Sequence, residues 1–207
     1  MKRMKRRRQE KIKFIVFDYG GVIAPEALSH RFSEKLSKKT GVDEKIILTI
    51  FKKNLKRFEL GKVSCENFWR NFSKTTGIEQ VVARNVLFSI VRPKKQMLKL
   101  VWKLKKEYKT VLLSNNIRDV SRRLVKKHQM KRYFNMLFFS CYIGKIKPEK
   151  HIYKYMLKKL NASPNEVVFI DDKKKNIIGA RAVGINGIVF KNAVQLKRDL
   201  KRHGVKI

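Results

Sequence analysis

The first candidate for chemistry is Asp18, an acidic residue that stands directly after a short apolar run. Residues 14–17 are aromatic and β-branched, which is typical of a buried strand. Gly20 and Gly21 follow, so we expect the chain to leave the strand through a tight turn. Ligands of parallel sheets bind at the carboxyl ends of strands. A carboxylate there can be a nucleophile or a metal ligand, and the alternative is an aspartate that only begins a turn.

Further polar side chains stand at the ends of later apolar runs. Ser114 and Asn115 follow one run, Asp171 and Asp172 follow another, and Lys147 directly precedes a proline that can begin a helix. Each of these has an ordinary explanation as a helix cap, a turn or one of many lysines. Their order along the chain is harder to explain in that way. It predicts a nucleophile, a hydroxyl donor, a cation and a metal site on one edge of a sheet.

The elements that must position these residues alternate between strands and helices. Strand patterns lie at residues 14–17, 110–113, 136–140, 167–170 and 187–190. Helical patterns lie at residues 27–39, 43–60, 65–76, 78–91, 93–106, 148–160 and 173–183, with two more beginning at 118 and after 191. This alternation predicts an α/β protein with a Rossmann-like, doubly wound parallel sheet. Residues 25–92 contain helices only, which predicts a helical cap inserted after the first strand and lying over the sheet edge like a lid. Residues 11–24 and 93–207 then form the core.

The charge balance is unusual, with 52 lysines and arginines against 16 acidic residues and a formal net charge of +36. Such a surface attracts phosphorylated ligands and can bind nucleic acid without sequence preference, although a basic bias of solvated faces explains the composition more simply, because the basic residues are scattered along the whole chain. We interpret residues 1–10 as a disordered basic arm. Cys65 and Cys141 lack metal-site spacing, which indicates reduced thiols in a cytoplasmic protein. No stretch is long enough to span a membrane, and the composition leaves the oligomeric state open.

With these motifs in order, the chain resembles the haloacid dehalogenase-like hydrolase superfamily. The resemblance is to its subfamily IA, variant-3-like branch, which includes sugar-phosphate phosphatases and the N-terminal domain of soluble epoxide hydrolase. The first motif of that branch reads Asp-x-Gly-x-Val, as residues 18–22 do. The later motifs match residues 113–116, residues 144–153, and residues 169–172 with Asn176. The segment 58–64 with Phe68 and Trp69 is similar to the helical cap of this branch, so the resemblance covers about residues 13–195.

The resemblance implies a phosphomonoester hydrolase acting on a small phosphorylated metabolite such as a sugar phosphate. Asp18 would attack phosphorus to form an aspartyl-phosphate, Ser114 would donate a hydrogen bond to a phosphoryl oxygen, and Lys147 would neutralise the clustered negative charge. Gly21 and Asn115 would lie against the substrate. Mg²⁺ prefers hard oxygen ligands. The family pattern assigns these to Asp18, the Gly20 carbonyl, Asp172 and, directly or through water, Asp171.

Gly20 departs from the pattern of many phosphatases in this superfamily, which have a second aspartate at that position as general acid and base. A positioned acid is typically worth about 10²–10⁴-fold in rate. Glu26 and Glu59 are candidates to replace it by position, although both have the alternative of being surface glutamates. The glycine and the charge also favour an alternative function, a weakened scaffold with a nucleic-acid-associated or regulatory role. A metal-free dehalogenase fits less well because of the Asp171–Asp172 pair.

Overall fold

The computed structural model describes residues 11–26 and 28–207, so the predicted basic arm at residues 1–10 and the first residue of the predicted helix at 27–39 lie outside the described chain. The strands are β1 (Phe14–Phe17), β2 (Lys109–Ser114), β3 (Met136–Phe139), β4 (Val167–Asp171) and β5 (Asn186–Val189). The helices are α1 (Leu28–Thr40), α2 (Glu44–Glu59), α3 (Cys65–Thr76), α4 (Gln80–Ile90), α5 (Lys95–Leu104), α6 (Arg118–Lys126), α7 (Ser140–Ile143), α8 (Lys150–Leu160), α9 (Lys174–Arg181) and α10 (Ala193–Arg202), with 3₁₀ turns at Met130–Arg132 and Pro164–Glu166.

The five strands form one parallel sheet in the order β3-β2-β1-β4-β5, which confirms the predicted fold class. The chain moves outward from β1 to β3 and then returns to the other side of β1, so the winding reverses between β1 and β4. Ligands of open α/β sheets bind at such a reversal, outside the carboxyl ends of the strands. Phe17 of β1 pairs with Ile170 of β4, and the Asp18 N–H donates to the Ile170 carbonyl at 2.9 Å. This register brings Asp18 level with Asp171.

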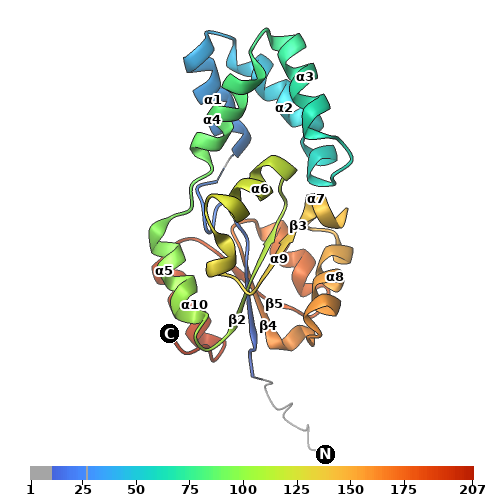
Figure 1. The fold of residues 1–207 in the computed structure, drawn as a ribbon. Helices are drawn as coiled ribbons and strands as arrows, with labels where there is room; N and C mark the ends of the chain where they lie inside the picture. Colours follow the sequence, from blue (N-terminus) through green and yellow to red (C-terminus); the bar gives the residue numbers. More distant parts are fainter. Residues whose placement is uncertain (1–10, 27) are drawn as a thin grey trace, which may run out of the picture.

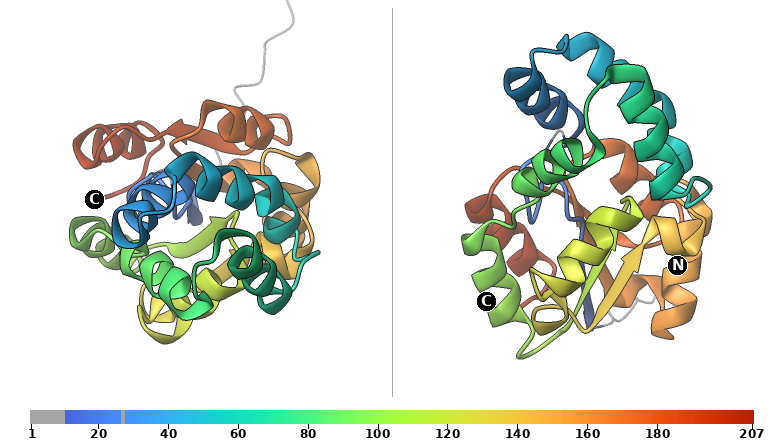
Figure 2. Two further views of the ribbon diagram at one scale, coloured as in Figure 1. Left: turned by 90° about the horizontal axis from the view of Figure 1, so that it is seen from above. Right: turned by 45° about the horizontal axis from the view of Figure 1, so that its top comes forward.

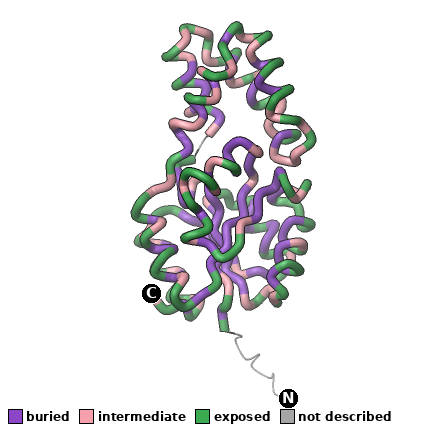
Figure 3. The backbone as a smooth tube through the Cα atoms, in the orientation of Figure 1, coloured by how far each residue is buried: buried purple, intermediate pink, exposed green. Residues whose placement is uncertain are grey.

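The strands of the sheet are largely buried (Figure 3), and their apolar residues belong to two separate buried clusters. Ile15 and Phe17 of β1 belong to the same buried cluster as residues of α5, α6 and α10. Val16 belongs to the opposite cluster, together with residues of α8 and α9. Because a strand turns successive side chains to opposite faces, a run that is apolar at every position is stable only when helices cover both faces.

Helices α1–α4 form a separate layer above the carboxyl edge of the sheet (Figures 1 and 2). Their ends follow local signals: Asp43 caps α2, Ser64 caps α3, and Gly77 ends α3 at φ +70°. Aromatic rings fill the interior of this layer in edge-on and tilted contacts, namely Phe32, Phe51, Phe58, Phe68, Trp69 and Phe72. We propose residues 25–92 as the cap, and residues 11–24 with 93–207 as the core. The Lys94 N–H donates to the Ile23 carbonyl at 2.7 Å, so the two chain segments that join cap and core lie side by side.

Several local predictions need correction. The strand expected at residues 136–140 ends at Phe139, and Ser140–Ile143 forms the short helix α7, which the sequence pattern did not predict. The helices expected from residues 93 and 148 begin two residues later, because Lys94 and Glu149 are extended, with ψ of 117° and 135°. Among the described residues, no helix is both long and apolar enough to cross a membrane.

Candidate active site

A buried lysine joins the ends of β1 and β4. The Lys147 amine lies 2.7 Å from Asp18 Oδ1 and 2.7 Å from Asp171 Oδ2. Lys147 is 3 %, Asp18 7 % and Asp171 0 % exposed, and buried charges are tolerated only when they are paired. Burial lowers the pKa of Lys147, but the two carboxylates outweigh burial and raise that pKa above its ordinary value. The amine therefore stays charged between the two aspartates, as the prediction for Lys147 requires.

The two oxygens of Asp18 have different surroundings. Oδ1 accepts hydrogen bonds from the Tyr19 N–H at 2.6 Å and from Lys147, whereas Oδ2 accepts none from the described residues. Burial raises the pKa of Asp18, and Lys147 and the Tyr19 N–H oppose this effect. One oxygen is thus held in place while the other is free to attack an electrophile or bind a cation.

Asp171 and Asp172 differ in how many hydrogen bonds their carboxylates accept. Both oxygens of Asp171 are occupied, because Oδ1 accepts from the Lys173 N–H at 2.9 Å and both oxygens accept from the Asn176 amide at 3.0 Å, in addition to Lys147 on Oδ2. Asp172 Oδ1 is buried and has no hydrogen-bond partner in the described chain. Burial raises the pKa of Asp172 to about 6, and Asp171 adds to that rise.

These three carboxylates fit a divalent cation. Each offers one oxygen, and the three oxygens lie within 4.8 Å of one another. A buried oxygen without a partner is unfavourable unless a water or an ion satisfies it, and Asp172 Oδ1 is such an atom. Hard oxygen donors are the ligands that Mg²⁺ prefers. Because Asp171 is already saturated with donors, Asp18 and Asp172 are the better candidates for direct ligands.

The two glycines after Asp18 are not equivalent. Gly21 has φ of +78°, and a Cβ added there would lie 2.2 Å from the Asp172 carboxyl carbon. At Gly20 a Cβ would have no neighbour within 4 Å, and its φ lies outside the left-handed region. Only Gly21 is therefore required by the backbone, and it is required because Asp172 packs directly against it.

We expect Gly21→Ala to displace Asp172 and to weaken divalent-cation binding by at least about tenfold, whereas Gly20→Ala should bind the cation as the wild type does. Titration of each purified variant with Mg²⁺, followed by calorimetry, checks this difference. Equal affinities for the two variants would contradict the role of Gly21.

Ser114 and Asn115, at the end of β2, lie at the same edge of the sheet as Lys147. Ser114 is buried at the end of β2, and within residues 11–26 and 28–207 its hydroxyl makes only a long contact of 3.4 Å with the Asn115 carbonyl. The Asn115 side chain donates to the Lys147 carbonyl at 3.0 Å and accepts from the Lys147 N–H at 2.9 Å. Asn115 was predicted to contact substrate, and this double hydrogen bond is a positioning contact that sequence reasoning missed. It holds Lys147 across 32 residues of chain.

A second positioning residue, Asn176, was recognised only as part of the fourth motif. Its side-chain amide N–H donates to both Asp171 oxygens, and its backbone carbonyl accepts from the Tyr153 hydroxyl at 2.7 Å. Tyr153 is fully buried on α8. The sequence signal for Asn176 is its position five residues after Asp171. Asn176 lies in the first turn of α9, which returns its side chain to the end of β4.

A cavity of about 700 Å³ lies between the cap and this edge of the sheet. Its core wall includes Asp18, Ser114 and Lys147, and its cap wall includes Arg31, Lys52 and Glu59. The structure thus brings together the residues predicted for catalysis, and both Glu26 and Glu59 line the same space. Glu26 is exposed, whereas Glu59 is half-buried.

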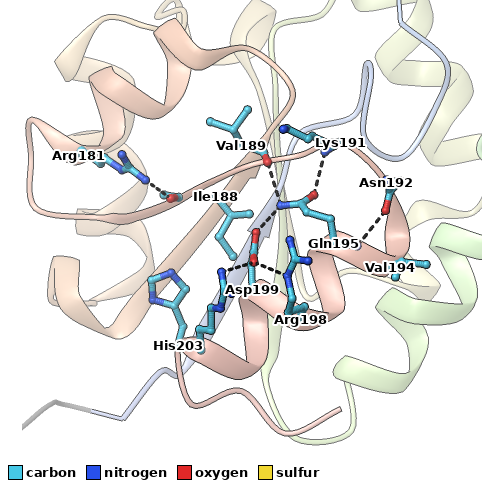
Figure 4. A pocket seen from close by; sticks show the side chains of 12 residues that line it. Arg181, Ile188, Val189, Lys191, Asn192, Val194, Gln195, Arg198, Asp199 and His203 are labelled. Carbon is cyan, nitrogen blue, oxygen red and sulfur yellow. Dashed lines mark hydrogen bonds and ion pairs between the residues drawn. The ribbon is translucent and has the colours of Figure 1, made fainter.

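A second cavity, of about 730 Å³, lies between β5 and α10 and contains none of the predicted site residues (Figure 4). Here Arg181 donates to the Gly187 carbonyl at 2.7 Å and Gln195 donates to the Val189 carbonyl at 3.1 Å. Because β5 is an edge strand, these side chains satisfy carbonyls that would otherwise be open to another strand. We interpret this hollow as protection of the sheet edge, and we place the candidate active site in the cavity at Asp18.

A doubly wound sheet with paired aspartates at its reversal point and a layer of helices above them defines an α/β protein with a candidate active site at the carboxyl edge of the sheet. Comparison with known proteins gives the family. The family model described as haloacid dehalogenase-like hydrolase matches residues 73–190, which is more than half of the chain and includes Ser114, Lys147, Asp171 and Asp172. The protein belongs to the haloacid dehalogenase-like hydrolases.

Individual relatives agree with this family. Bifunctional epoxide hydrolase 2 of Rattus norvegicus is 36 % identical over 137 residues, covering 64 % of this chain and 24 % of the relative, so the chain spans about a quarter of that protein. Sesquiterpene phosphatase astK of Aspergillus oryzae is 27 % identical over 195 residues, covering 92 % of this chain and 95 % of the relative. A haloacid dehalogenase family enzyme from Bacteroides thetaiotaomicron, solved with magnesium and inorganic phosphate, shares the fold with a TM-score of 0.77 at 24 % identity, over 89 % of this chain and 98 % of the other.

Proposed function

We propose that the protein is a Mg²⁺-dependent phosphomonoester hydrolase that works through an aspartyl-phosphate on Asp18 and acts on a small phosphorylated metabolite such as a sugar phosphate. The observation that carries the proposal is the bridge of Lys147 between Asp18 and Asp171, which leaves Asp18 Oδ2 free beside the cavity. A relative that this chain covers almost end to end is named a phosphatase, and a structure with the same fold holds magnesium and phosphate.

The proposed reaction begins when a phosphate group enters the cavity beside Asp18. Asp18 Oδ2 attacks phosphorus, the bond from phosphorus to the leaving oxygen breaks, and the phosphoryl group is transferred to Asp18. Water then attacks the aspartyl-phosphate, which releases inorganic phosphate and restores Asp18. Lys147 and the Ser114 hydroxyl contribute a positive charge and a hydrogen bond near the phosphoryl oxygens, where negative charge is concentrated.

Asp18, Asp172 and the Gly20 carbonyl would hold Mg²⁺, with Asp171 in support. Bound there, the cation would screen the carboxylate of Asp18 from the anionic substrate and orient the phosphate for in-line attack. The orphaned oxygen of Asp172 and the donor set of three carboxylates support this assignment.

We expect phosphate release from an aryl phosphate to fall by at least about 10²-fold when Mg²⁺ is removed by a chelator, and to return when Mg²⁺ is added back. Ca²⁺ should restore little activity, because it prefers longer bonds and more ligands than an octahedral magnesium site provides. The assay is steady-state release of inorganic phosphate. Undiminished activity in excess chelator would show that the carboxylates do not work with a cation.

A further inference from the structure

Carboxylates are concentrated at the candidate active site although the chain as a whole is strongly basic. Only 16 of its residues are acidic, and six of them stand at this site, namely Asp18, Glu26, Glu59, Glu149, Asp171 and Asp172. The chain is biased toward basic residues, so this bias does not explain why a glutamate lines the cavity. Glu26 and Glu149 are exposed, and Glu59 is the glutamate of the set that is shielded from solvent.

The end of α2 that carries Glu59 is held against the core. Gly61, two residues later, has φ of +69°, and a Cβ there would lie 2.2 Å from the Cys141 carbonyl oxygen of α7. Trp69 of α3 donates a buried hydrogen bond of 2.7 Å to Asp119 of α6. Both contacts join the α2–α3 corner of the cap to core elements that follow β2 and β3. Glu59 therefore lines the cavity from a part of the cap that is packed against the core.

Glu59 has no partner in this position. The described chain offers its carboxyl group no hydrogen bond and no ion pair, although the side chain is half-buried. Burial raises the pKa of Glu59, and Lys173, Lys147 and Lys175 oppose the rise without cancelling it. The positive charge of Lys147, which pairs with Asp18, thus also acts on Glu59. A partly shielded, unpaired carboxyl group that lines the same cavity as a nucleophile has the properties of a general acid.

We propose that Glu59 is the general acid and base of this enzyme and replaces the carboxylate that is absent at Gly20. This inference rests on the proposed phosphatase function. In the first step the carboxylic acid of Glu59 gives its proton to the leaving oxygen as the bond from phosphorus to that oxygen breaks. In the second step the Glu59 carboxylate takes a proton from the attacking water, the bond from phosphorus to Asp18 breaks, and inorganic phosphate leaves. The proton is thus returned and the cycle closes.

The test compares Glu59→Gln with the wild type on two substrates, an alkyl phosphate with a poor leaving group and p-nitrophenyl phosphate with a good one. We expect the variant to lose about 10²–10⁴-fold in turnover of the alkyl phosphate. On p-nitrophenyl phosphate its first turnover should stay near the wild-type rate, because that leaving group needs little protonation. A slow steady state should follow, with phosphorylated protein visible by intact mass, because the base for the second step is missing.

Glu79→Gln is the matched control, since it makes the same change at an exposed glutamate of the cap whose side chain makes no capping hydrogen bond. Circular dichroism and thermal melting of both variants report on folding. Adding Gly20→Asp to Glu59→Gln should recover part of the alkyl phosphate turnover, because the new carboxyl group has open space beside Asp18.

The inference is overturned if Glu59→Gln matches Glu79→Gln on both substrates, or if it slows the first turnover equally on both, which would indicate a structural role. A wild-type protein inactive on every phosphoester would instead overturn the proposed function itself.

Discussion

Replacing Asp18 with asparagine is expected to lower phosphoester turnover by at least about 10³-fold while the protein stays folded. The amide keeps the shape of the side chain, and its oxygen can still accept from the Tyr19 N–H and from Lys147. An amide oxygen is a poor nucleophile toward phosphorus, so the covalent step is lost. Phosphate release from p-nitrophenyl phosphate measures the loss. Beryllium fluoride, which mimics an acyl phosphate on an aspartate, should form a stable complex with the wild type and none with the variant.

Asp43→Asn is the matched control, because Asp43 caps α2 and asparagine caps helices equally well. It should retain wild-type activity and stability. The covalent mechanism would be refuted by an Asp18→Asn protein that keeps more than about a few per cent of the wild-type rate, since a residue that forms the covalent bond has no such tolerance.

Lys147→Met should be the most destabilising single change at this site, lowering the free energy of unfolding by about 3–5 kcal/mol. The substitution preserves much of the side-chain volume and removes the charge that Asp18 and Asp171 share at 2.7 Å. Two buried carboxylates would then face each other without a cation. Urea denaturation in the presence of a chelator measures the effect, and Lys150→Met, at an exposed lysine of α8, is the control. Phosphatase activity should be lost together with stability, because the same amine neutralises the negative charge at the site.

The destabilisation should depend on pH. Burial raises the pKa of Asp18 above 3.8 and Lys147 lowers it, so removing Lys147 lets that pKa rise further. A carboxyl group with a higher pKa in the folded state binds more protons when folded, so stability falls as the pH increases through that pKa. Because the pKa of Asp18 is already raised to about 7 in the wild type, the difference from the wild type should be small below about pH 7 and grow as the pH rises above it. A difference that is constant across this range would mean that the lost stability comes from packing.

Much of this architecture follows from local patterns. Apolar runs that end on Asp18, Ser114 and Asp171 predicted strands of a parallel sheet, because only a sheet covered on both faces accommodates strands without polar alternation. The helices predicted at residues 43–60 and 65–76 begin directly after Asp43 and Ser64, whose capping hydrogen bonds span only three residues. The order of the motifs was enough to expect them on one edge, and in the structure Lys147 lies between Asp18 and Asp171 at the ends of β1 and β4.

Other features depend on contacts between distant segments. Asn115 and Lys147 are 32 residues apart, and Trp69 and Asp119 are 50 apart. The roles of these residues are decided by which elements pack together, and no periodicity records that. Asp171 illustrates the same limit, since its neighbour Asp172 is the same residue type but has an unsatisfied oxygen, while Lys147 and Asn176 saturate Asp171.

The cavity contains both features that the sequence predicts and features that only tertiary packing decides. Residue types and their order were sufficient to predict the strands and to propose a helical insertion and a set of acids and bases for catalysis, because these depend on short-range geometry and intrinsic chemistry. The +36 charge remained ambiguous, because composition does not say which faces the charges occupy. The positions of Lys147 and Glu59 relative to Asp18 were decided by the tertiary structure alone. Packing brings these groups into a shared, partly dehydrated space, where burial and neighbouring charges change their protonation and thus the chemistry they can perform.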